Sequence, residues 1–197
     1  MQKWRRHRTN WAVSFRYHIV TMSRRKKHKQ KAEPLRPVEE HFAVLSRYSA
    51  DPRNRLIQYV FIPVFAFAIL GLVWMVPFPE IGFLKKHGYD IFLNWGSVFI
   101  AIVVYYYLRL APTLSYVVLL TIGVFSFLIV QLEYVERDGG PAAWLVFLVL
   151  LVLSVLALWI GKDREKEKMP FRHFLKLLLI GPIWLWSFVF KRMGWPY

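Results

Sequence analysis

The chain has 197 residues, of which 56% are hydrophobic and 18% aromatic, and it carries 27 Lys and Arg against 12 Asp and Glu. Soluble domains usually contain about 45–50% apolar residues, so this composition excludes most soluble folds and indicates an integral membrane protein. The absence of cysteine excludes disulfides, thiolate metal sites and cysteine nucleophiles. The net charge of +15 indicates an anionic neighbour: a phospholipid surface, a nucleic acid or an acidic protein.

The positive charge is concentrated at the amino terminus. Residues 1–41 hold twelve Lys or Arg and three acids, Glu33, Glu39 and Glu40. We therefore expect two parts, a basic amphipathic segment (1–41) and a membrane domain (42–197). In the basic segment, five apolar residues recur at helical spacing and would share one face of a helix lying on a membrane: Trp4, Trp11, Phe15, Ile19 and Met22.

This basic segment has several interpretations. An Arg-rich, acid-poor amphipathic start is typical of a mitochondrial targeting segment and also of a surface anchor that stays on the protein. A nucleic-acid-binding arm is less favoured, and the run 24–31 is also explained as a solvated stretch of charge. If the segment binds lipid headgroups or a partner protein, we expect the contacts to come from Arg5, Arg6, Arg8, Arg24, Arg25, Lys26, Lys27, Lys29, Trp4 and Trp11.

Four stretches are apolar and long enough to cross a membrane as helices: residues 56–76, 91–111, 113–132 and 141–160. The roughly 30 Å hydrocarbon core requires about 20 helical residues. A fifth apolar run, 174–190, is shorter and contains Gly181 and Pro182, which favours a kinked interfacial or re-entrant helix. The predicted fold class is all-α: a membrane four-helix bundle with a basic amino-terminal extension and a carboxy-terminal interfacial or re-entrant helix.

The loops predict the orientation of this bundle. The basic segment, the turn at 109–113 and the stretch 162–172 would share one side and carry nearly all of the Lys and Arg. The loops 78–90 and 133–140, on the other side, carry few. By the positive-inside rule, the amino terminus lies in the cytosol or the mitochondrial matrix. The mitochondrial inner membrane is the favoured location, and the endoplasmic reticulum is the alternative.

The four predicted spans carry no charged residue near their middle, which disfavours an ion channel, a proton relay or a voltage sensor. The sequence also contains no phosphate-binding loop, no zinc-protease motif and no nucleophile motif of the hydrolases. Its six histidines are too scattered to form a metal cluster by spacing alone. Enzymes of these common classes are therefore disfavoured.

Two segments carry a resemblance to a known family. Residues 49–63 read SADPRNRLIQYVFIP, and residues 158–182 read LWIGKDREKEKMPFRHFLKLLLIGP. Together they resemble the iron-dependent 2-hydroxy fatty acid dioxygenases, small multi-span membrane proteins that shorten long-chain 2-hydroxy acids. That family has His-x-x-x-x-Asn-x-x-x-His before an apolar stretch with a Pro, and later Ile-Gly-His, an acidic-basic patch, a Pro and a Leu-rich run. The order and spacing of these elements agree over most of residues 45–195.

The sequence departs from this pattern at three positions. Ser49, Gln58 and Lys162 stand where the resembled family has histidine, and the resemblance implies that those histidines bind the iron. Ser and Gln are weak ligands and an ammonium group repels a divalent cation, so we expect no metal, no cofactor and no catalytic residue. The nearby acids alternate with Lys and Arg, which favours mutual neutralisation over a substitute metal site. Other positions follow the pattern: Asn54, Pro63, Ile160, Gly161, Pro170 and Pro182.

Three hypotheses for function remain. The favoured one is a non-catalytic scaffold, derived from the dioxygenase-like fold, that serves as an accessory subunit of a larger complex in the mitochondrial inner membrane. The second is a divergent oxygenase of 2-hydroxy fatty acids or another lipid-modifying protein, in which His41, His87 or His173 converge on a metal. The third is a protein that binds anionic lipid, such as cardiolipin or phosphatidylserine, through its basic segment.

Overall fold

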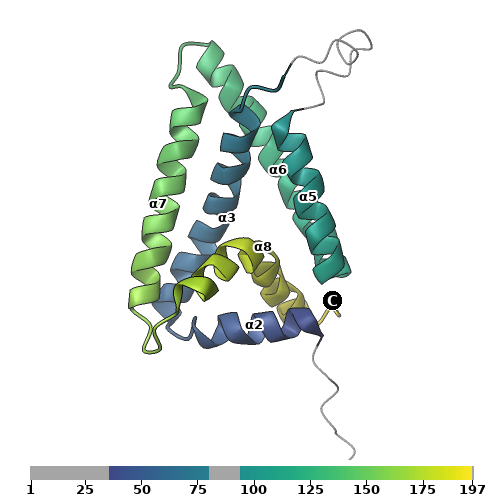
Figure 1. Cartoon of the computed structure of the whole chain (residues 1–197), viewed down its shortest axis with the longest axis vertical. Coiled ribbons are helices and arrows are strands. Elements are labelled where there is room, and N and C mark those ends of the chain that lie inside the picture. The colour runs from purple at the N-terminus through teal and green to yellow at the C-terminus, as the bar shows by residue number, and fades with distance from the viewer. Residues whose placement is uncertain (1–35, 80–93, 197) are drawn as a thin grey trace, which may run out of the picture. The chain divides into compact units, whose positions relative to one another are not determined.

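The computed structural model describes residues 36–79 and 94–196. Within these two ranges the chain forms six α-helices and no strand (Figure 1). The all-α prediction is therefore confirmed. In chain order the helices are α2 (Pro37–Arg47), α3 (Pro52–Met75), α5 (Trp95–Leu110), α6 (Pro112–Arg137), α7 (Ala143–Asp163) and α8 (Phe171–Met193).

Four of the described helices are long and apolar enough to cross a membrane: α3, α6, α7 and α8. Helix α5 is also apolar, but its 16 residues correspond to about 24 Å of helix. A capping box fixes its start, because the side chains of Asn94 and Ser97 each accept a hydrogen bond from the backbone N–H of the other. The expected span 91–111 thus begins at Trp95 in the structure, and residues 91–93 lie outside the described part.

The other expected spans agree with the helices except at their ends. Helix α3 begins four residues before the expected span 56–76, and α6 continues five residues beyond the expected span 113–132. The added residues are mostly polar or charged. They continue the helix past the apolar stretch. A membrane-spanning helix can extend beyond the hydrocarbon core, where its polar residues meet water and headgroups.

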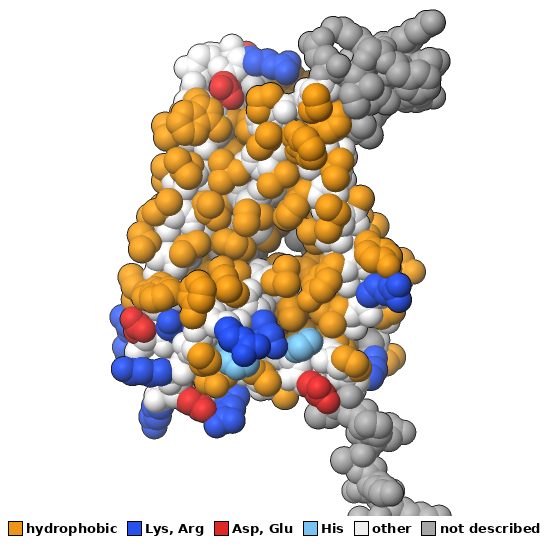
Figure 2. Space-filling model, in the orientation of Figure 1, with side chains coloured by type: hydrophobic (Ala, Val, Ile, Leu, Met, Phe, Trp, Pro, Cys, Tyr) orange, Lys and Arg blue, Asp and Glu red, His pale blue; other side chains and the backbone are white. Residues whose placement is uncertain are grey.

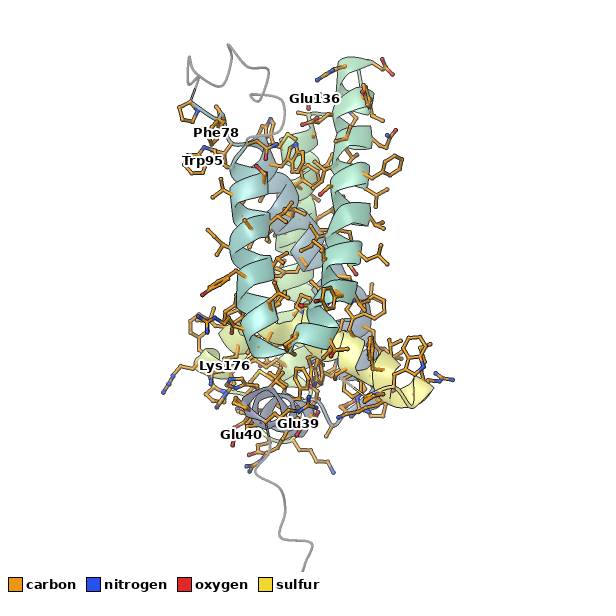
Figure 3. All side chains as sticks on the ribbon, turned by 90° about the vertical axis from the view of Figure 1, so that its right-hand side faces the viewer. Glu39, Glu40, Phe78, Trp95, Glu136 and Lys176 are labelled. Atoms are coloured by element: carbon orange, nitrogen blue, oxygen red, sulfur yellow. The ribbon has the colours of Figure 1, made fainter. Side chains whose placement is uncertain are left out.

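Helix α8 differs from the shorter run that we expected at 174–190. It continues as one helix of 23 residues through Pro182 and ends at Met193, followed by the C-cap residue Gly194, which has a left-handed backbone conformation. Figure 1 shows that α8 is bent and lies with α2 at the end of the bundle where α3 begins, and Figure 3 shows the same position from the side. A proline inside a helix removes one backbone hydrogen bond, and this bends a helix without necessarily ending it.

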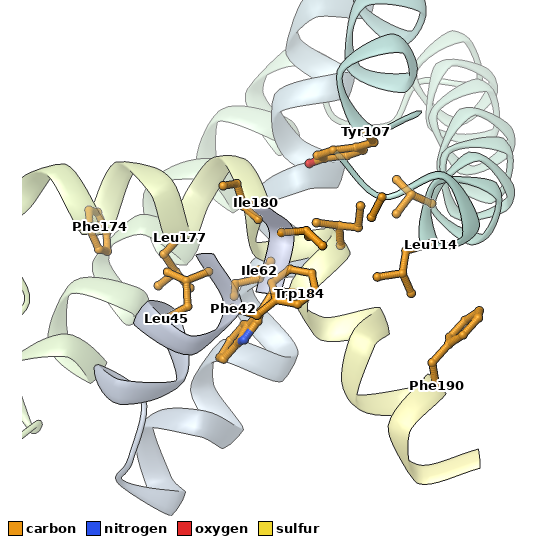
Figure 4. Packing of buried hydrophobic residues seen from close by; sticks show 14 of the residues in the cluster. Phe42, Leu45, Ile62, Tyr107, Leu114, Phe174, Leu177, Ile180, Trp184 and Phe190 are labelled. Carbon is orange, nitrogen blue, oxygen red and sulfur yellow. The ribbon is translucent and has the colours of Figure 1, made fainter. Parts of the chain in front are cut away.

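Helix α3 occupies the centre of the bundle, where it packs against α5, α6, α7 and α8. At the α2–α8 end, a cluster of buried apolar side chains joins α2, α3 and α8 (Figure 4). Its largest member is Trp184, which is 1% exposed. A second cluster, from α3, α6 and α7, consists of Leu70, Ile129, Ala143 and Phe147.

The surface of the bundle is mostly apolar. Large apolar side chains remain exposed along α5, α6 and α7. Figure 2 shows hydrophobic side chains covering most of one face, with Lys and Arg gathered at the α2–α8 end. The α5–α6 turn and the α7–α8 connection both lie at that end (Figure 1). These two loops were expected to share one side of the membrane. Such an apolar surface is typical of a protein that is embedded in a lipid bilayer.

The basic amino-terminal segment lies almost entirely outside the described residues. The lipid or partner contacts expected of Trp4, Trp11 and the basic residues between Arg5 and Lys29 therefore stay predictions. Helix α2 starts at Pro37, inside the predicted segment 1–41, and packs against α8. The buried side chains of α2 are Val38, Phe42 and Leu45.

Candidate functional site

The connection between α2 and α3 is held by side chains from the start of α3. Asp51 is the N-cap residue of α3, and its Oδ1 accepts a hydrogen bond from the backbone N–H of Arg53 at 2.7 Å. Arg55 donates from Nε and Nη2 to the carbonyl oxygen of Ser49, at 3.3 and 2.9 Å. These bonds fix the backbone of residues 49–51 beside the first turn of α3.

Glu165, in the connection between α7 and α8, binds the same segment from the other side. Its carboxylate accepts hydrogen bonds from the backbone N–H groups of Ala50 at 3.2 Å and Asp51 at 3.1 Å, and from Nδ2 of Asn54 at 2.6 Å. The residue is only 8% exposed. A buried carboxylate needs such donors, because its desolvation costs several kcal/mol. Glu165 therefore ties the end of α7 to the start of α3.

Two further polar residues lie one turn apart on the same face of α3. Asn54 and Gln58 are 0% and 1% exposed, and Ser49, before the helix, is 0% exposed. Asn54 lies directly against α7, because a Cβ atom on Gly161 would be 2.5 Å from its Oδ1. We call Ser49, Asn54, Gln58 and Glu165 the buried polar centre.

Lys162 follows Gly161 at the edge of this buried polar centre. Its Nζ lies 3.8 Å from the centroid of the Trp159 ring and 5.6 Å from the centroid of the Phe174 ring. The negative faces of aromatic rings attract a cation at such distances. The charged end of Lys162 is thus held between aromatic side chains of α7 and α8.

Four buried side-chain atoms have no hydrogen-bond partner in the described part of the chain. Three belong to the buried polar centre, and the fourth is Nδ1 of His173, whose ring stacks on Tyr48 with a centroid distance of 5.3 Å. An unpartnered buried polar atom costs about 1–3 kcal/mol. The site therefore contains buried polar atoms that do not stabilise the packing of the helices. The four atoms are Ser49 Oγ, Asn54 Oδ1, Gln58 Oε1 and His173 Nδ1.

An ion pair lies outside the buried polar centre, at the surface. Arg47 of α2 contacts Glu167 with two nitrogens, Nη2 at 2.6 Å and Nε at 2.7 Å. The hydrogen bond and the charge of Glu167 raise the pKa of the Arg47 guanidinium above its usual value. Both side chains are exposed, so the pair contributes little stability. It does hold α2 beside the α7–α8 connection.

The donor atoms of this site do not fit a ferrous iron ion. Such an ion in an oxygenase takes neutral imidazole or carboxylate ligands and keeps open positions. Here the three positions singled out by the resemblance carry a hydroxyl, an amide and an ammonium group, and both oxygens of Glu165 already accept hydrogen bonds. Within residues 36–79 and 94–196, no three His, Asp or Glu side chains are grouped to hold a metal ion. That range includes His41 and His173, whereas His87 lies outside it.

The position of Glu165 was not predictable from the local sequence. The alternating acids and bases between Asp163 and Lys168 favoured mutual neutralisation within the stretch. Glu167 does pair with a base, but with Arg47 of α2. Glu165 instead accepts hydrogen bonds from the start of α3, which lies beside the end of α7. A weak signal was Gly161, a residue small enough to let two helices approach closely.

Comparison with known proteins supports one family. A family model described as Mpo1-like, 2-hydroxy-palmitic acid dioxygenase Mpo1-like, matches residues 35–193. No curated protein and no solved structure matches the chain. The match covers both segments that carry the resemblance and confirms it. The replacement of histidine at Ser49, Gln58 and Lys162 stays a prediction.

Proposed function

The chain belongs to the Mpo1-like family, and on this premise we propose that it is a non-catalytic membrane scaffold that keeps the family fold without an iron site. In the cell it serves as an accessory subunit of a larger membrane complex, most simply in the mitochondrial inner membrane. The observation that supports this proposal is the chemistry of the buried polar centre, where Ser49 and Gln58 are buried and Lys162 lies at the edge.

The remaining side chains do not offer a substitute reaction. Ser49 Oγ has no hydrogen-bond partner among the described residues, so no adjacent base activates it as a nucleophile. The carboxylate of Glu165 is occupied by three donors that hold the backbone. The ammonium of Lys162 is held over the ring of Trp159, 3.8 Å from its centroid.

Two features support a role in an assembly. The described helices expose large apolar side chains that can contact lipid or the spans of neighbouring subunits. Residues 1–41 carry twelve Lys or Arg and three acids, and each basic residue near an anionic leaflet contributes about 1 kcal/mol. The basic segment would then lie on the matrix-side leaflet or bind an acidic neighbour.

Two alternatives belong to other classes. One is a divergent lipid oxygenase, and the unpartnered Nδ1 of His173 is the observation that favours it. The other is a protein whose main role is to bind anionic lipid with the basic segment. The first requires a metal and the second does not, so the metal content separates them.

The first test is the iron content of the purified full chain. After expression with iron supplementation, we expect elemental analysis to find far less than one iron per chain, because the donor atoms are unsuitable. One tightly held iron per chain would overturn the proposal and favour the oxygenase.

A restoring variant tests whether the three positions are former ligand positions. We expect the triple substitution Ser49→His, Gln58→His and Lys162→His to raise the iron content well above that of the natural chain. The matched control places three histidines at exposed positions of the same end, with Arg53→His, Arg164→His and Lys168→His. Equal iron in the two variants, with both folded by circular dichroism, would contradict the assignment.

The scaffold role is tested in the native membrane. After mild solubilisation, we expect the full chain to migrate in native electrophoresis well above the mass of a monomer, and to crosslink reproducibly to defined neighbours. Migration as a monomer with no crosslinked neighbour would exclude the accessory-subunit role even if the protein held no iron.

A further inference from the structure

An apolar cavity of about 330 Å³ lies in the bundle, between α3, α5, α6 and α8. This volume is at the lower end of the range of ligand pockets, roughly 300–1,000 Å³. Nearly all of its wall is apolar, and each of the four helices contributes an aromatic side chain: Phe65, Phe99, Phe125 and Trp186.

The few polar groups in the wall are occupied. The hydroxyl of Tyr107 donates to the carbonyl oxygen of Leu179 at 2.6 Å. Thr121 Oγ1 donates to the carbonyl oxygen of Val117 and accepts from Nε1 of Trp186 at 3.2 Å. Since these groups are satisfied within the protein, the interior of the cavity favours a hydrocarbon chain over a polar ligand.

Helix α8 lines this cavity and also carries two basic residues near its start. Leu175 and Leu179 line the cavity and are 49% and 53% exposed, so this part of its wall also contributes to the surface of the bundle. Arg172 and Lys176 share that face of α8, at spacings of three and four residues, towards the polar end of the helix. Neither basic side chain makes an ion pair or a hydrogen bond in the described part of the chain.

In Figure 2, the apolar side chains are hollowed above a group of Lys, Arg and His side chains on the same face. Figure 3 places Lys176 at the α2 end of the bundle, where α5 ends. The exposed part of the cavity wall thus stands on the same face of α8 as two cations that have no partner among the described residues.

We propose that the cavity and these two basic residues together bind an anionic phospholipid. One acyl chain lies in the cavity, and the phosphate contacts Arg172 and Lys176. The apolar wall recognises the acyl chain, and the charge complementarity selects an anionic headgroup over a zwitterionic one. The residues of this site do not belong to the basic amino-terminal segment. It also does not depend on the proposed loss of iron, since it involves none of the residues of the buried polar centre.

The test uses the full chain in nanodiscs that contain phosphatidylcholine and phosphatidylglycerol. We expect one phosphatidylglycerol per chain to stay bound in native mass spectrometry, in preference to phosphatidylcholine. The substitutions Arg172→Gln and Lys176→Gln should weaken this retention about 30-fold, because two basic groups contribute about 1 kcal/mol each and 1.4 kcal/mol is tenfold.

The matched control removes the same charge elsewhere at the same end, with Lys166→Gln and Lys168→Gln, both exposed. It should change the retention less than about twofold. Equal losses in the two variants would overturn the proposal, because they would indicate general surface electrostatics. Equal retention of the two lipids by the natural chain would overturn it as well.

Two further measurements test the occupant of the cavity. A phosphatidylglycerol with brominated acyl chains should quench the fluorescence of Trp186, measured as the difference between the natural chain and Trp186→Phe. Ala66→Phe, which fills the cavity, should remove this retention in a folded protein. Displacement of phosphatidylglycerol by an equal amount of palmitic acid would overturn the phospholipid assignment in favour of a free fatty acid.

Discussion

Glu165 and Glu167 stand two residues apart in one charged stretch, yet their environments are opposite. Glu167 is exposed and pairs with Arg47, whereas Glu165 is buried and accepts three hydrogen bonds from the start of α3. Removing the acceptor at a buried position leaves donors unpaired, and removing one partner of an exposed ion pair leaves it in water. At the scale of single residues, the two acids therefore differ in how much they contribute to the stability of the fold.

We expect Glu165→Gln to lower the free energy of unfolding by about 2 kcal/mol, because the amide N–H₂ of glutamine would face the donors of Ala50, Asp51 and Asn54. The matched control is Glu167→Gln, which should cost less than about 1 kcal/mol. Denaturant unfolding in detergent micelles measures both values. Equal effects would show that Glu165 is not a buried anchor.

Ser49 provides the opposite case, because its Oγ is buried and has no hydrogen-bond partner among the described residues. If the centre no longer has a chemical role, Ser49→Ala should leave stability unchanged or raise it by about 1 kcal/mol, since it removes an unsatisfied hydroxyl. The measurement is the same unfolding curve. A loss of more than about 1 kcal/mol would indicate a stabilising partner for this hydroxyl.

At the scale of helices, α3 and α7 approach closely at both ends of their contact. A Cβ on Gly71 of α3 would overlap the ring of Phe147, and a Cβ on Gly161 of α7 would be 2.5 Å from Asn54 Oδ1. Association of helices in lipid depends on close packing, which small residues allow. The two glycines thus set the distance between α3 and α7, and with it the position of Glu165 over the start of α3.

We expect Gly161→Ala to destabilise the protein by about 1–3 kcal/mol, because the new methyl group would push α7 away from Asn54. Gly123→Ala in α6 is the matched control, since nothing lies within 4 Å of its Cβ. The control should be neutral or stabilising by up to about 1 kcal/mol, from helix propensity alone. Thermal unfolding of the two variants compares them. Equal destabilisation would contradict the close approach at Gly161.

The elements themselves were largely predictable, with α8 as the exception. Apolar runs of about 20 residues predicted α3, α6 and α7 to within a few residues at each end. The run containing Gly181 and Pro182 was expected to be shorter, but it forms one bent helix of 23 residues that packs on α2, α3 and α6. Packing on three neighbours compensates for the backbone hydrogen bond that Pro182 removes.

At the scale of the whole chain, charge divides the described structure into two ends. The α2–α8 end collects the Lys and Arg of α2, the α7–α8 connection and α8, whereas the other end carries few (Figure 2). The positive-inside rule assigns the α2–α8 end to the cytosol or the matrix. This assignment stays a prediction.

The absence of cysteine makes this orientation simple to test. We expect a membrane-impermeant maleimide, applied to sealed vesicles with the original membrane orientation, to label Asp138→Cys at the outer end. Lys168→Cys, at the α2–α8 end, should react only after permeabilisation. Both residues are exposed, so each serves as the control for the other. The reverse labelling pattern would invert the orientation and place the basic segment outside.

Composition and the length of apolar runs were enough to predict an all-α membrane protein and, with two short segments, its family, because these signals are local in the chain. Which polar residues are buried was decided only by the tertiary structure. Glu165 and Asn54 are 111 residues apart and meet because α3 and α7 pack closely. The cavity beside Arg172 and Lys176 likewise requires four helices to come together. Local patterns do not encode such contacts, since burial depends on neighbours that are distant in the sequence.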